Sequence, residues 1–470
     1  MTKLLQPSTG FAWSASLPGP SEAARAEKVR QLRAEAISKL LFEQQAWQLR
    51  KVQSHQLQNG NYAVVRVSID CIPQELPGLE YMLGGSGDGA SLIVPVTYMD
   101  RSTLRQFDMR GLNGESLPVI GRSEYTDWML DVLAYQIEPA LTAEPHWEVV
   151  QAALTTILDG EVDTATKLSE HLIESGTVEG LTVLRAESLS AFAKELLRAL
   201  ARSYVLFVLV PRDYAQRRVV IKYSYQADQK RADGNGRDRW RSAAGLAPIA
   251  VTFELTHPTG AASHHLEVSV PADLSCSVLR MPGSYTDRNT ENSSEGGVVH
   301  AVSSYTEDPD TPALAEFEVP WRGMRATTWV ISATTFVILY LGLVLPGAQH
   351  ALLEGAGGAG TLLLGVIAVA VAFAAGRRES AVESALLGPL RTCVLGCSLL
   401  LLACATSIVG GLHEPFRISL WSFGAALTGT LTITLCAHEG KARWGAGWRW
   451  LVGFVAVVAA VLLACGVLLW

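Results

Sequence analysis

The chain divides into two parts according to the length of its apolar runs. Five runs in its C-terminal third each approach the roughly 20 residues that an α-helix needs to cross a bilayer. None of them contains Lys, Arg, Asp, Glu or His, and they are Thr327–Leu345, Gly358–Ala375, Thr392–Gly411, Ile418–Ala437 and Leu451–Trp470. No apolar run of this length occurs in residues 1–320. The pattern therefore predicts a soluble region followed by an all-α transmembrane bundle of five helices.

Basic residues are distributed unevenly around these runs. Only Arg417 lies on one side, whereas the other side carries Arg322, Arg325, Arg377, Arg378, Arg391, Lys441, Arg443 and Arg449. Lys and Arg in short loops stay on the cytoplasmic side, so we predict a multi-pass protein of the cell (inner) membrane. Its N-terminal region would be cytoplasmic and its C-terminus extracytoplasmic. The first 20 residues contain no apolar run of the signal-peptide type, which agrees with this orientation.

The soluble region shows both helical and strand patterns. Ser21 is placed to cap a long helix over Glu22–Ser54, and helical spacing returns between Thr126 and Ser203. Asn113-Gly114 is a strong hairpin signal. Period-two or short apolar runs predict strands at Tyr62–Asp70, Ser91–Tyr98, Leu104–Met109, Ser116–Ile120, Tyr204–Val210, Arg218–Tyr225, Ala250–Leu255, His264–Val270, Ser275–Met281, Gly297–Ser304 and Ala313–Val319. We therefore expect an α+β cytoplasmic region, antiparallel and β-rich with a helical insertion.

These patterns suggest four segments along the chain. They are an N-terminal tail and long helix (1–55), a mixed β/helical cytoplasmic domain (56–245), a small antiparallel β-sandwich (246–320) and the five-helix transmembrane region (321–470). Only about seven residues separate the last predicted strand from the first span, so the two would be coupled mechanically. Residues 1–320 are long enough to bury a substantial core, and we expect them to fold without the membrane.

Charge and cysteine usage fit a reducing compartment. The whole chain has a formal net charge of -7, but its first 320 residues carry 29 basic and 40 acidic side chains. A domain this acidic repels nucleic acid, which we exclude as a partner. Five of the seven cysteines fall inside the predicted spans, leaving Cys71 and Cys276 in the soluble region, where we expect them to be reduced and buried.

Four segments together carry a resemblance to known proteins. They are Leu92–Val96, Leu104–Ile120, Arg217–Tyr225 and His264–Pro271. In sequence and order they resemble a family of uncharacterised bacterial multi-pass membrane proteins with a large cytoplasmic β-rich domain. The resemblance implies the architecture given above, and it carries over no activity and no site residues.

The soluble region offers little candidate chemistry. Gly84–Gly89 lacks the Gly-Lys-Ser/Thr ending of a phosphate loop and is better explained as a connection between strands. His257, His264, His265 and Glu267 could begin a metal site, but we favour ordinary strand positions, and we interpret Glu307–Asp310 as a turn. No catalytic motif is present, so we predict no enzyme, no cofactor and no metal. A catalytic constellation assembled from distant residues stays open, because triads are defined by geometry.

Three sets of residues are candidates for contacts at or within the membrane. A basic segment could face anionic lipid, although a solvated strand and loop is the favoured interpretation; its members are Arg217, Arg218, Lys222, Lys230, Arg231, Arg237, Arg239 and Arg241. In the fifth span, Ala456, Ala460 and Ala464 share one helix face, which favours close helix packing. In the fourth span, Thr428, Thr430, Thr432 and Thr434 favour interhelical hydrogen bonds over a pore lining.

Two classes of function follow from these predictions. In the first, the cytoplasmic domain is a non-enzymatic interaction or sensing module anchored by the five helices. In the second, a ligand of that domain gates a pore or effector made by oligomerised transmembrane helices. The spans contain no ionisable side chain, which disfavours an ion-coupled transporter. Either class predicts the lipid bilayer as one partner and a protein or a second copy of the chain as another.

Overall fold

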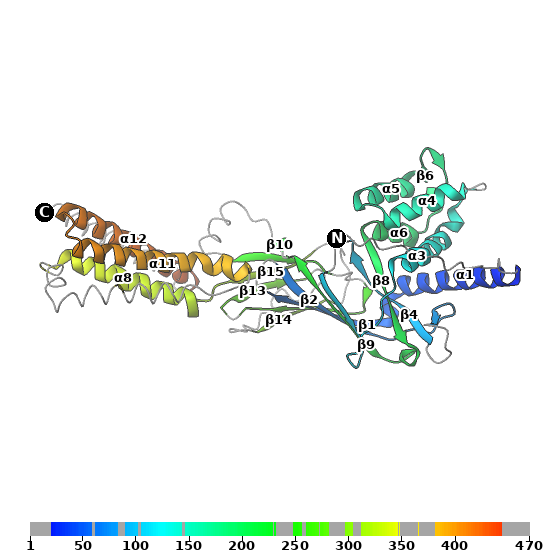
Figure 1. Cartoon of the computed structure of the whole chain (residues 1–470), viewed down its shortest axis with the longest axis horizontal. Coiled ribbons are helices and arrows are strands. Elements are labelled where there is room, and N and C mark those ends of the chain that lie inside the picture. The colour runs from blue at the N-terminus through cyan, green and yellow to red at the C-terminus, as the bar shows by residue number, and fades with distance from the viewer. Residues whose placement is uncertain are drawn as a thin grey trace, which may run out of the picture.

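The structure is an elongated α+β chain, which confirms the predicted mixture of helices and sheets. It is a computed structural model that describes residues 20–58, 62–82, 90–101, 105–142, 146–228, 230–231, 248–255, 260–271, 273–281, 297–303, 312–345, 347, 365 and 381–443. Long apolar helices form one end, β-sheets the middle, and a group of shorter helices the other end (Figure 1).

The N-terminal helix is shorter than predicted. Helix α1 (Pro20–Phe42) is followed by a single turn, α2 (Gln44–Trp47), and then by strand β1 (Gln48–Leu57). The prediction of a helix up to Ser54 is therefore wrong over its last third. The inward positions of β1 are the polar residues Lys51, Gln53 and His55, so the strand carries no apolar alternation to reveal it.

A six-stranded sheet crosses the middle of the molecule. Its strand order is β14-β12-β1-β2-β9-β5, and only the β1–β12 pair is parallel among the pairs described. The strands besides β1 are β2 (Tyr62–Cys71), β5 (Arg105–Arg110), β9 (Val219–Asp228), β12 (His264–Ser269) and β14 (Val298–Ser303). The sheet takes strands from all three soluble segments, and the boundary placed at residue 55 falls inside β1.

A second sheet of four strands packs against the β12–β14 end of the first. Its order is β10-β11-β15-β13, with β10 (Lys230–Arg231), β11 (Ile249–Phe253), β13 (Ser275–Arg280) and β15 (Ala313–Glu318). Val251, Leu266, Val268 and Phe317 are buried between the two sheets. The strands predicted in this region are present, but they are divided between two sheets: β12 and β14 belong to the first sheet, and β11, β13 and β15 belong to the second. We refer to the two packed sheets as the sandwich. Cys276 lies in it, and both Cys276 and Cys71 are buried and free, as expected.

The opposite end combines a small sheet with helices. Strands β3 (Glu80–Met82), β4 (Ala90–Asp100) and β8 (Ser203–Pro211) pair in that order. The helices are α3 (Arg122–Ile137), α4 (Trp147–Asp159), α5 (Val162–Ser175) and α6 (Ala191–Arg202), with short turns η1 (Glu138–Ala140), η2 (Ala186–Ser188) and η3 (Arg212–Tyr214) and a hairpin of β6 (Thr177–Val178) and β7 (Leu181–Thr182). Phe207, Met129, Leu133 and Ile37 are fully buried in their shared core.

The hairpin predicted at Asn113-Gly114 forms only in part. The turn is present, with Gly114 at a φ of +83°, which favours glycine. The second strand, Ser116–Ile120, is wrong: it is reduced to single bridges between Arg110 and Ser116 and between Val119 and Val208. The chain here leaves β5 and turns to β8, where Leu209 N donates to Pro118 O (2.9 Å) and Ile120 N donates to Phe207 O (3.1 Å).

Three helices in the described part of the C-terminal region are long and apolar enough to cross a membrane. A π-helical turn η5 (Trp321–Arg325) leads into α8 (Ala326–Val344), and α11 (Ala381–Val409) and α12 (Glu414–Arg443) follow. Their candidate spans, Gly323–Val344, Val382–Ile408 and Glu414–Cys436, correspond to the first, third and fourth predicted runs. The second and fifth runs, Gly358–Ala375 and Leu451–Trp470, lie outside the described residues except for Gly365.

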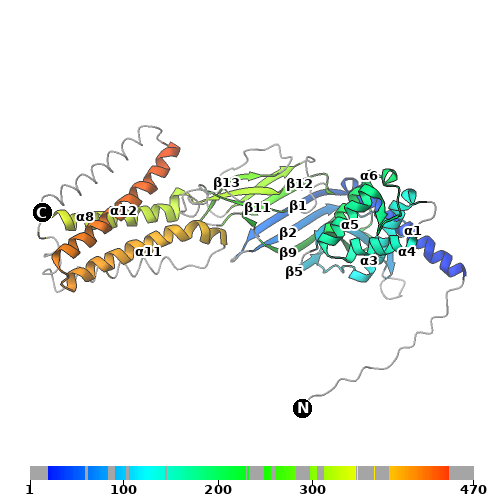
Figure 2. The ribbon, with the colours of Figure 1, turned by 90° about the horizontal axis from the view of Figure 1, so that it is seen from above.

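Helices α8 and α12 cross each other (Figure 2), and small and hydroxyl-bearing residues lie at their contact. Gly342 lies against the ring of Trp421, whose Nε1 donates to Ser407 Oγ of α11 (3.4 Å). Thr432 Oγ1 donates to Ser332 Oγ across the α12–α8 interface at 3.0 Å. The prediction of an interhelical hydrogen bond from the threonines of this helix is therefore confirmed for Thr432.

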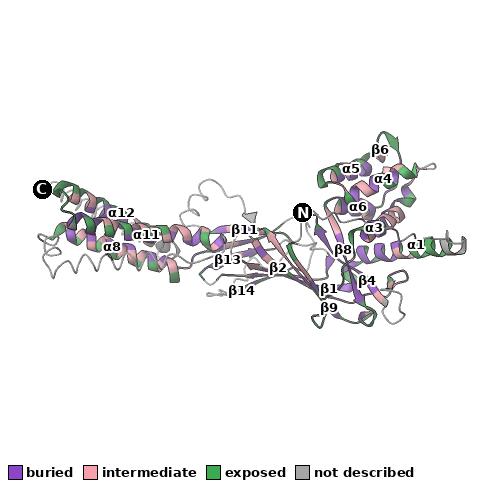
Figure 3. Cartoon of the chain, viewed as in Figure 1, coloured by how far each residue is buried: buried purple, intermediate pink, exposed green. Residues whose placement is uncertain are grey.

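The sandwich and the apolar helices share one hydrophobic core. Helix α11 begins eleven residues before the run predicted at Thr392. The described core between the sheets and the helix ends is completed by Val382, Leu386, Leu387 and Leu390 of α11 and by Leu435 of α12. Figure 3 shows buried positions running through the sheets and into the helices. Strand β15 is separated from η5 by only two residues, so the predicted direct connection is confirmed.

Candidate functional site

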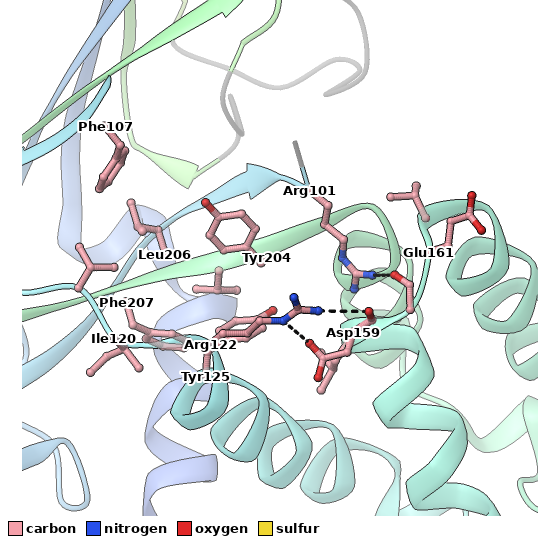
Figure 4. Close-up of a pocket in the computed structure, with 15 residues that line it drawn as sticks. Arg101, Phe107, Ile120, Arg122, Tyr125, Asp159, Glu161, Tyr204, Leu206 and Phe207 are labelled. Carbon is pink, nitrogen blue, oxygen red and sulfur yellow. Dashed lines mark hydrogen bonds and ion pairs between the residues drawn. The ribbon is translucent and has the colours of Figure 1, made fainter. Parts of the chain in front are cut away.

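A cavity of about 670 Å³ opens between the strand edges and the shorter helices (Figure 4). It lies where edge strands β5 and β8 meet α3 and the turn between α4 and α5. Its lining residues are Arg101, Phe107, Val119, Ile120, Arg122, Tyr125, Leu158, Asp159, Gly160, Glu161, Val162, Tyr204, Val205, Leu206 and Phe207. A volume of this size is typical of sites that take small organic molecules.

One end of this cavity is apolar and aromatic. Phe107, Ile120, Leu206 and Phe207 gather there, and Figure 4 shows them on the side away from the charged residues. The ring of Tyr125 lies 6.2 Å from the rings of both Tyr204 and Phe207, measured between centroids. Such distances are typical of edge-to-face and tilted aromatic pairs, so the wall is ordered by ring contacts.

The other end is charged but internally balanced. Arg122 Nε lies 3.1 Å from Asp159 Oδ1, and Thr126 Oγ1 donates to Asp159 Oδ2 at 3.1 Å. The guanidinium of Arg101 donates to Gly160 O (3.0 Å) and also to the carbonyls of Ile157 and Leu200, so it joins the C-terminal ends of α4 and α6. Burial lowers the pKa of Arg101, which nevertheless remains a cation.

Two tyrosines lie between these ends. Burial raises the pKa of both the Tyr125 and the Tyr204 phenols, so both stay protonated at neutral pH. The Tyr125 hydroxyl is buried beside the backbone of Val205. The lining offers hydrogen-bond donors and aromatic faces, an arrangement suited to binding rather than to nucleophilic chemistry.

A layer of buried polar side chains separates the two hydrophobic cores, and we refer to Lys51, Gln53, His55, Thr97 and His264 as the polar layer. Lys51 Nζ donates to Thr97 Oγ1 (3.3 Å), and its strand position is opposite His264. Gln53 Nε2 lies 2.8 Å from both His55 Nε2 and the carbonyl oxygen of Glu254. Burial lowers the pKa of Lys51 to about 7 and that of His55 to about 3. The layer is therefore held mainly in its uncharged form above neutral pH.

The basic segment is divided between the two sheets where it is described. Arg217 and Arg218 precede β9, Lys222 lies on β9, and Lys230 with Arg231 forms β10. Arg218 Nε lies 2.8 Å from Asp70 Oδ1, and this hydrogen bond lowers the pKa of Asp70. Arg237, Arg239 and Arg241 lie outside the described residues, as do Ala456, Ala460 and Ala464. A lipid-facing role for the segment and the packing role of the alanines stay predictions.

The candidate metal ligands on β12 point to different environments. His264 is buried, whereas His265 and Glu267 share the opposite face, as expected from their spacing. Glu267 Oε1 lies 3.5 Å from His300 Nδ1 on β14. Within the ranges that the structure describes, no three His, Cys, Asp or Glu side chains form a metal-binding group. His257, Gly84–Gly89 and Glu307–Asp310 lie outside those ranges.

Sequence reasoning missed the cavity, whose lining comes from five separate parts of the chain between Arg101 and Phe207. No short motif joins these residues, and only the folded sheet edges bring them together.

No known family model matches the chain. A comparison with curated proteins also found no match. The interpretation of the cavity therefore rests on its own geometry.

Proposed function

We propose that this chain is a multi-pass membrane protein whose cytoplasmic domain is a non-enzymatic interaction or sensing module, anchored by five helices in the inner membrane. The observation that carries the proposal is the core shared by the sandwich and the ends of α11 and α12. A simple tether would need no such core, because a flexible linker would hold the domain at the membrane equally well.

The shared core supports transmission between the two parts. Leu386 and Leu387 of α11 are fully buried, and Phe317 of β15 belongs to the same cluster. Because packed cores shift between discrete arrangements and do not deform continuously, a change in the sandwich would move the helix ends. The partners of such a module are the bilayer and a protein or a second copy of the chain.

The shared core also favours the alternative function, a pore or effector gated by a cytoplasmic ligand. In this alternative, oligomerised helices would line a path with the exposed hydroxyls of Thr430 and Thr434, which at present donate to Ala426 O and Thr430 O of their own helix. Purified protein in liposomes separates the two functions. Reproducible ion flux would favour the pore, and its absence with every added ligand would favour the sensing module.

Topology provides the direct test of the cytoplasmic assignment. Alkaline phosphatase is active only outside the cytoplasm, so we expect a fusion after Trp470 to be active. Fusions within Gly376–Leu390 or Gly440–Ala446 should be inactive, because these loops carry the excess of Lys and Arg. The opposite pattern would place the β-rich domain outside and refute the proposal. Inactivity at the C-terminus alone would indicate an even number of spans.

A further inference from the structure

We propose that the cavity beside β8 binds a small uncharged aromatic molecule that carries a hydroxyl or carbonyl head group. The inference deepens the proposed sensing function by naming the class of molecule that would be sensed, and its biological meaning rests on that function. Binding itself does not depend on that function, because the cavity lies at the far end of the molecule from the apolar helices (Figure 1).

The walls of the cavity select an aromatic body. Phe107, Tyr125, Tyr204 and Phe207 present four rings around about 670 Å³, and aliphatic side chains fill the spaces between them. Aromatic guests pair with such rings in offset or edge-to-face contacts, whereas a sugar or a peptide backbone would lose hydration at this end without gaining hydrogen bonds. The apolar end therefore excludes strongly polar ligands.

The polar end selects a head group without net charge. Arg101 and Arg122 face Asp159 and Glu161, so the formal charges of the lining cancel. Arg122 is already paired with Asp159, and Arg101 is held by three carbonyl groups. An anionic ligand would lose hydration here without a free cationic partner, and the exposed carboxylate of Glu161 would repel it. A hydroxyl can instead donate to the Asp159 carboxylate, and a hydroxyl or a carbonyl can accept from the Tyr204 phenol.

Direct binding of 2-naphthol to the purified full chain tests the proposal. This probe has two aromatic rings and a hydroxyl that is uncharged at neutral pH. Equilibrium dialysis in matched detergent should show saturable binding that Val162→Trp weakens at least tenfold. Val162 lines the cavity and is 36% exposed, so a larger side chain can grow into the cavity without compressing a core.

Matched variants distinguish binding of 2-naphthol in the cavity from its uptake by detergent micelles. They also show whether a loss of binding is caused by unfolding of the variant. Val29→Trp on α1, at a residue 45% exposed and not in the lining, should bind as the unchanged chain does. Val119→Trp, at another exposed residue of the lining, should weaken binding as well. Equal binding by the unchanged chain and both cavity variants, with melting temperatures preserved, would overturn the proposal.

The charge of the probe tests the head group. We expect 2-naphthol to bind at least tenfold more tightly than 2-naphthoate, its carboxylate counterpart. Asp159→Asn removes one of the two acidic groups, so 2-naphthoate should gain affinity several-fold in this variant. Tighter binding of 2-naphthoate to the unchanged chain would refute the assignment of an uncharged head group. These outcomes are independent of the fusion and flux experiments, so failure here and failure of the proposed function are distinguishable.

Discussion

The two hydrophobic cores of this chain are closed in different ways. The core beside the shorter helices is completed by neighbouring residues, because α1, α3, α4 and α6 cover β4 and β8. Among the described residues, the buried side chains that complete the sandwich core come from α11 and α12, which lie more than 60 residues after its last strand. One half of the soluble region is therefore self-sufficient, whereas the other half depends on the apolar helices as a packing surface.

Truncation should produce the largest difference between the two cores. A chain ending at Pro320 lacks every α11 and α12 residue of the sandwich core. The sequence alone predicts that residues 1–320 fold without the membrane, but the shared core leads us to expect this only for the half with α3–α6. Hydrogen exchange should show protected amides in α3 and β8 and fast exchange in β11, β13 and β15. Full protection of β15 in the truncated chain would make the two cores equally independent.

Substitution of a single residue of the shared core should also destabilise the sandwich, but less than truncation does. Leu387→Ala removes a fully buried side chain from the shared core, and such changes destabilise by about 2–5 kcal/mol. The matched control is Leu399→Ala on the same helix, at a residue 65% exposed. Thermal unfolding in detergent should show a clear loss for the first variant and little for the second. Equal losses would mean that α11 does not stabilise the sandwich.

Close packing of α8 on α12 should be sensitive to one methyl group. A Cβ added at Gly342 would collide with the ring of Trp421, and overpacking of this kind destabilises by about 1–3 kcal/mol. Gly396→Ala on α11 is the control, because a Cβ there meets nothing within 4 Å. We expect a lower melting temperature for Gly342→Ala alone. A similar result for the two variants would argue that the helices are loosely packed.

The smallest effect should come from the polar layer between the cores. A substitution there should change how the stability of the folded chain depends on pH. Burial lowers the pKa of Lys51 from 10.5 to about 7 in the folded chain. Between these values the unfolded chain binds a proton that the folded chain does not, so stability should increase as pH increases from about 7 to about 9. Lys51→Met removes this titration and should flatten the rise in melting temperature. Lys222→Met, at an exposed position of β9, should preserve it.

The sequence predicts an element well where composition and burial agree. The alternation of β2 and β9 is visible because most of their buried positions are apolar. The runs of α8 and α12 are visible because their exposed positions, such as Val330, Val337 and Phe423, are apolar as well. Strand β1 was missed because its buried positions are Lys51, Gln53 and His55, which favour no strand by pattern. The start of α11 was missed because Glu383 and Arg391 interrupt the apolar run, although the helix continues through both.

The candidate site was beyond sequence reasoning for a different reason. Arg101, Asp159 and Tyr204 are separated by dozens of residues, and each occupies a position of ordinary composition. Arg101 and Tyr204 meet because β4 pairs with β8, and the hydrogen bonds of Arg101 to the end of α4 bring Asp159 beside them. Local propensity does not encode such long-range pairing.

The late position of α11 in the chain has a consequence for synthesis. Phe317 leaves the ribosome about 70 residues before Leu387, which at about 5–20 residues per second is a delay of several seconds. During this interval β15 is already made, but the surface that covers its core is not. The sandwich should then be a target for chaperones until α11 has inserted. Slower membrane insertion should therefore lower the yield of the whole protein through aggregation of its β-rich half.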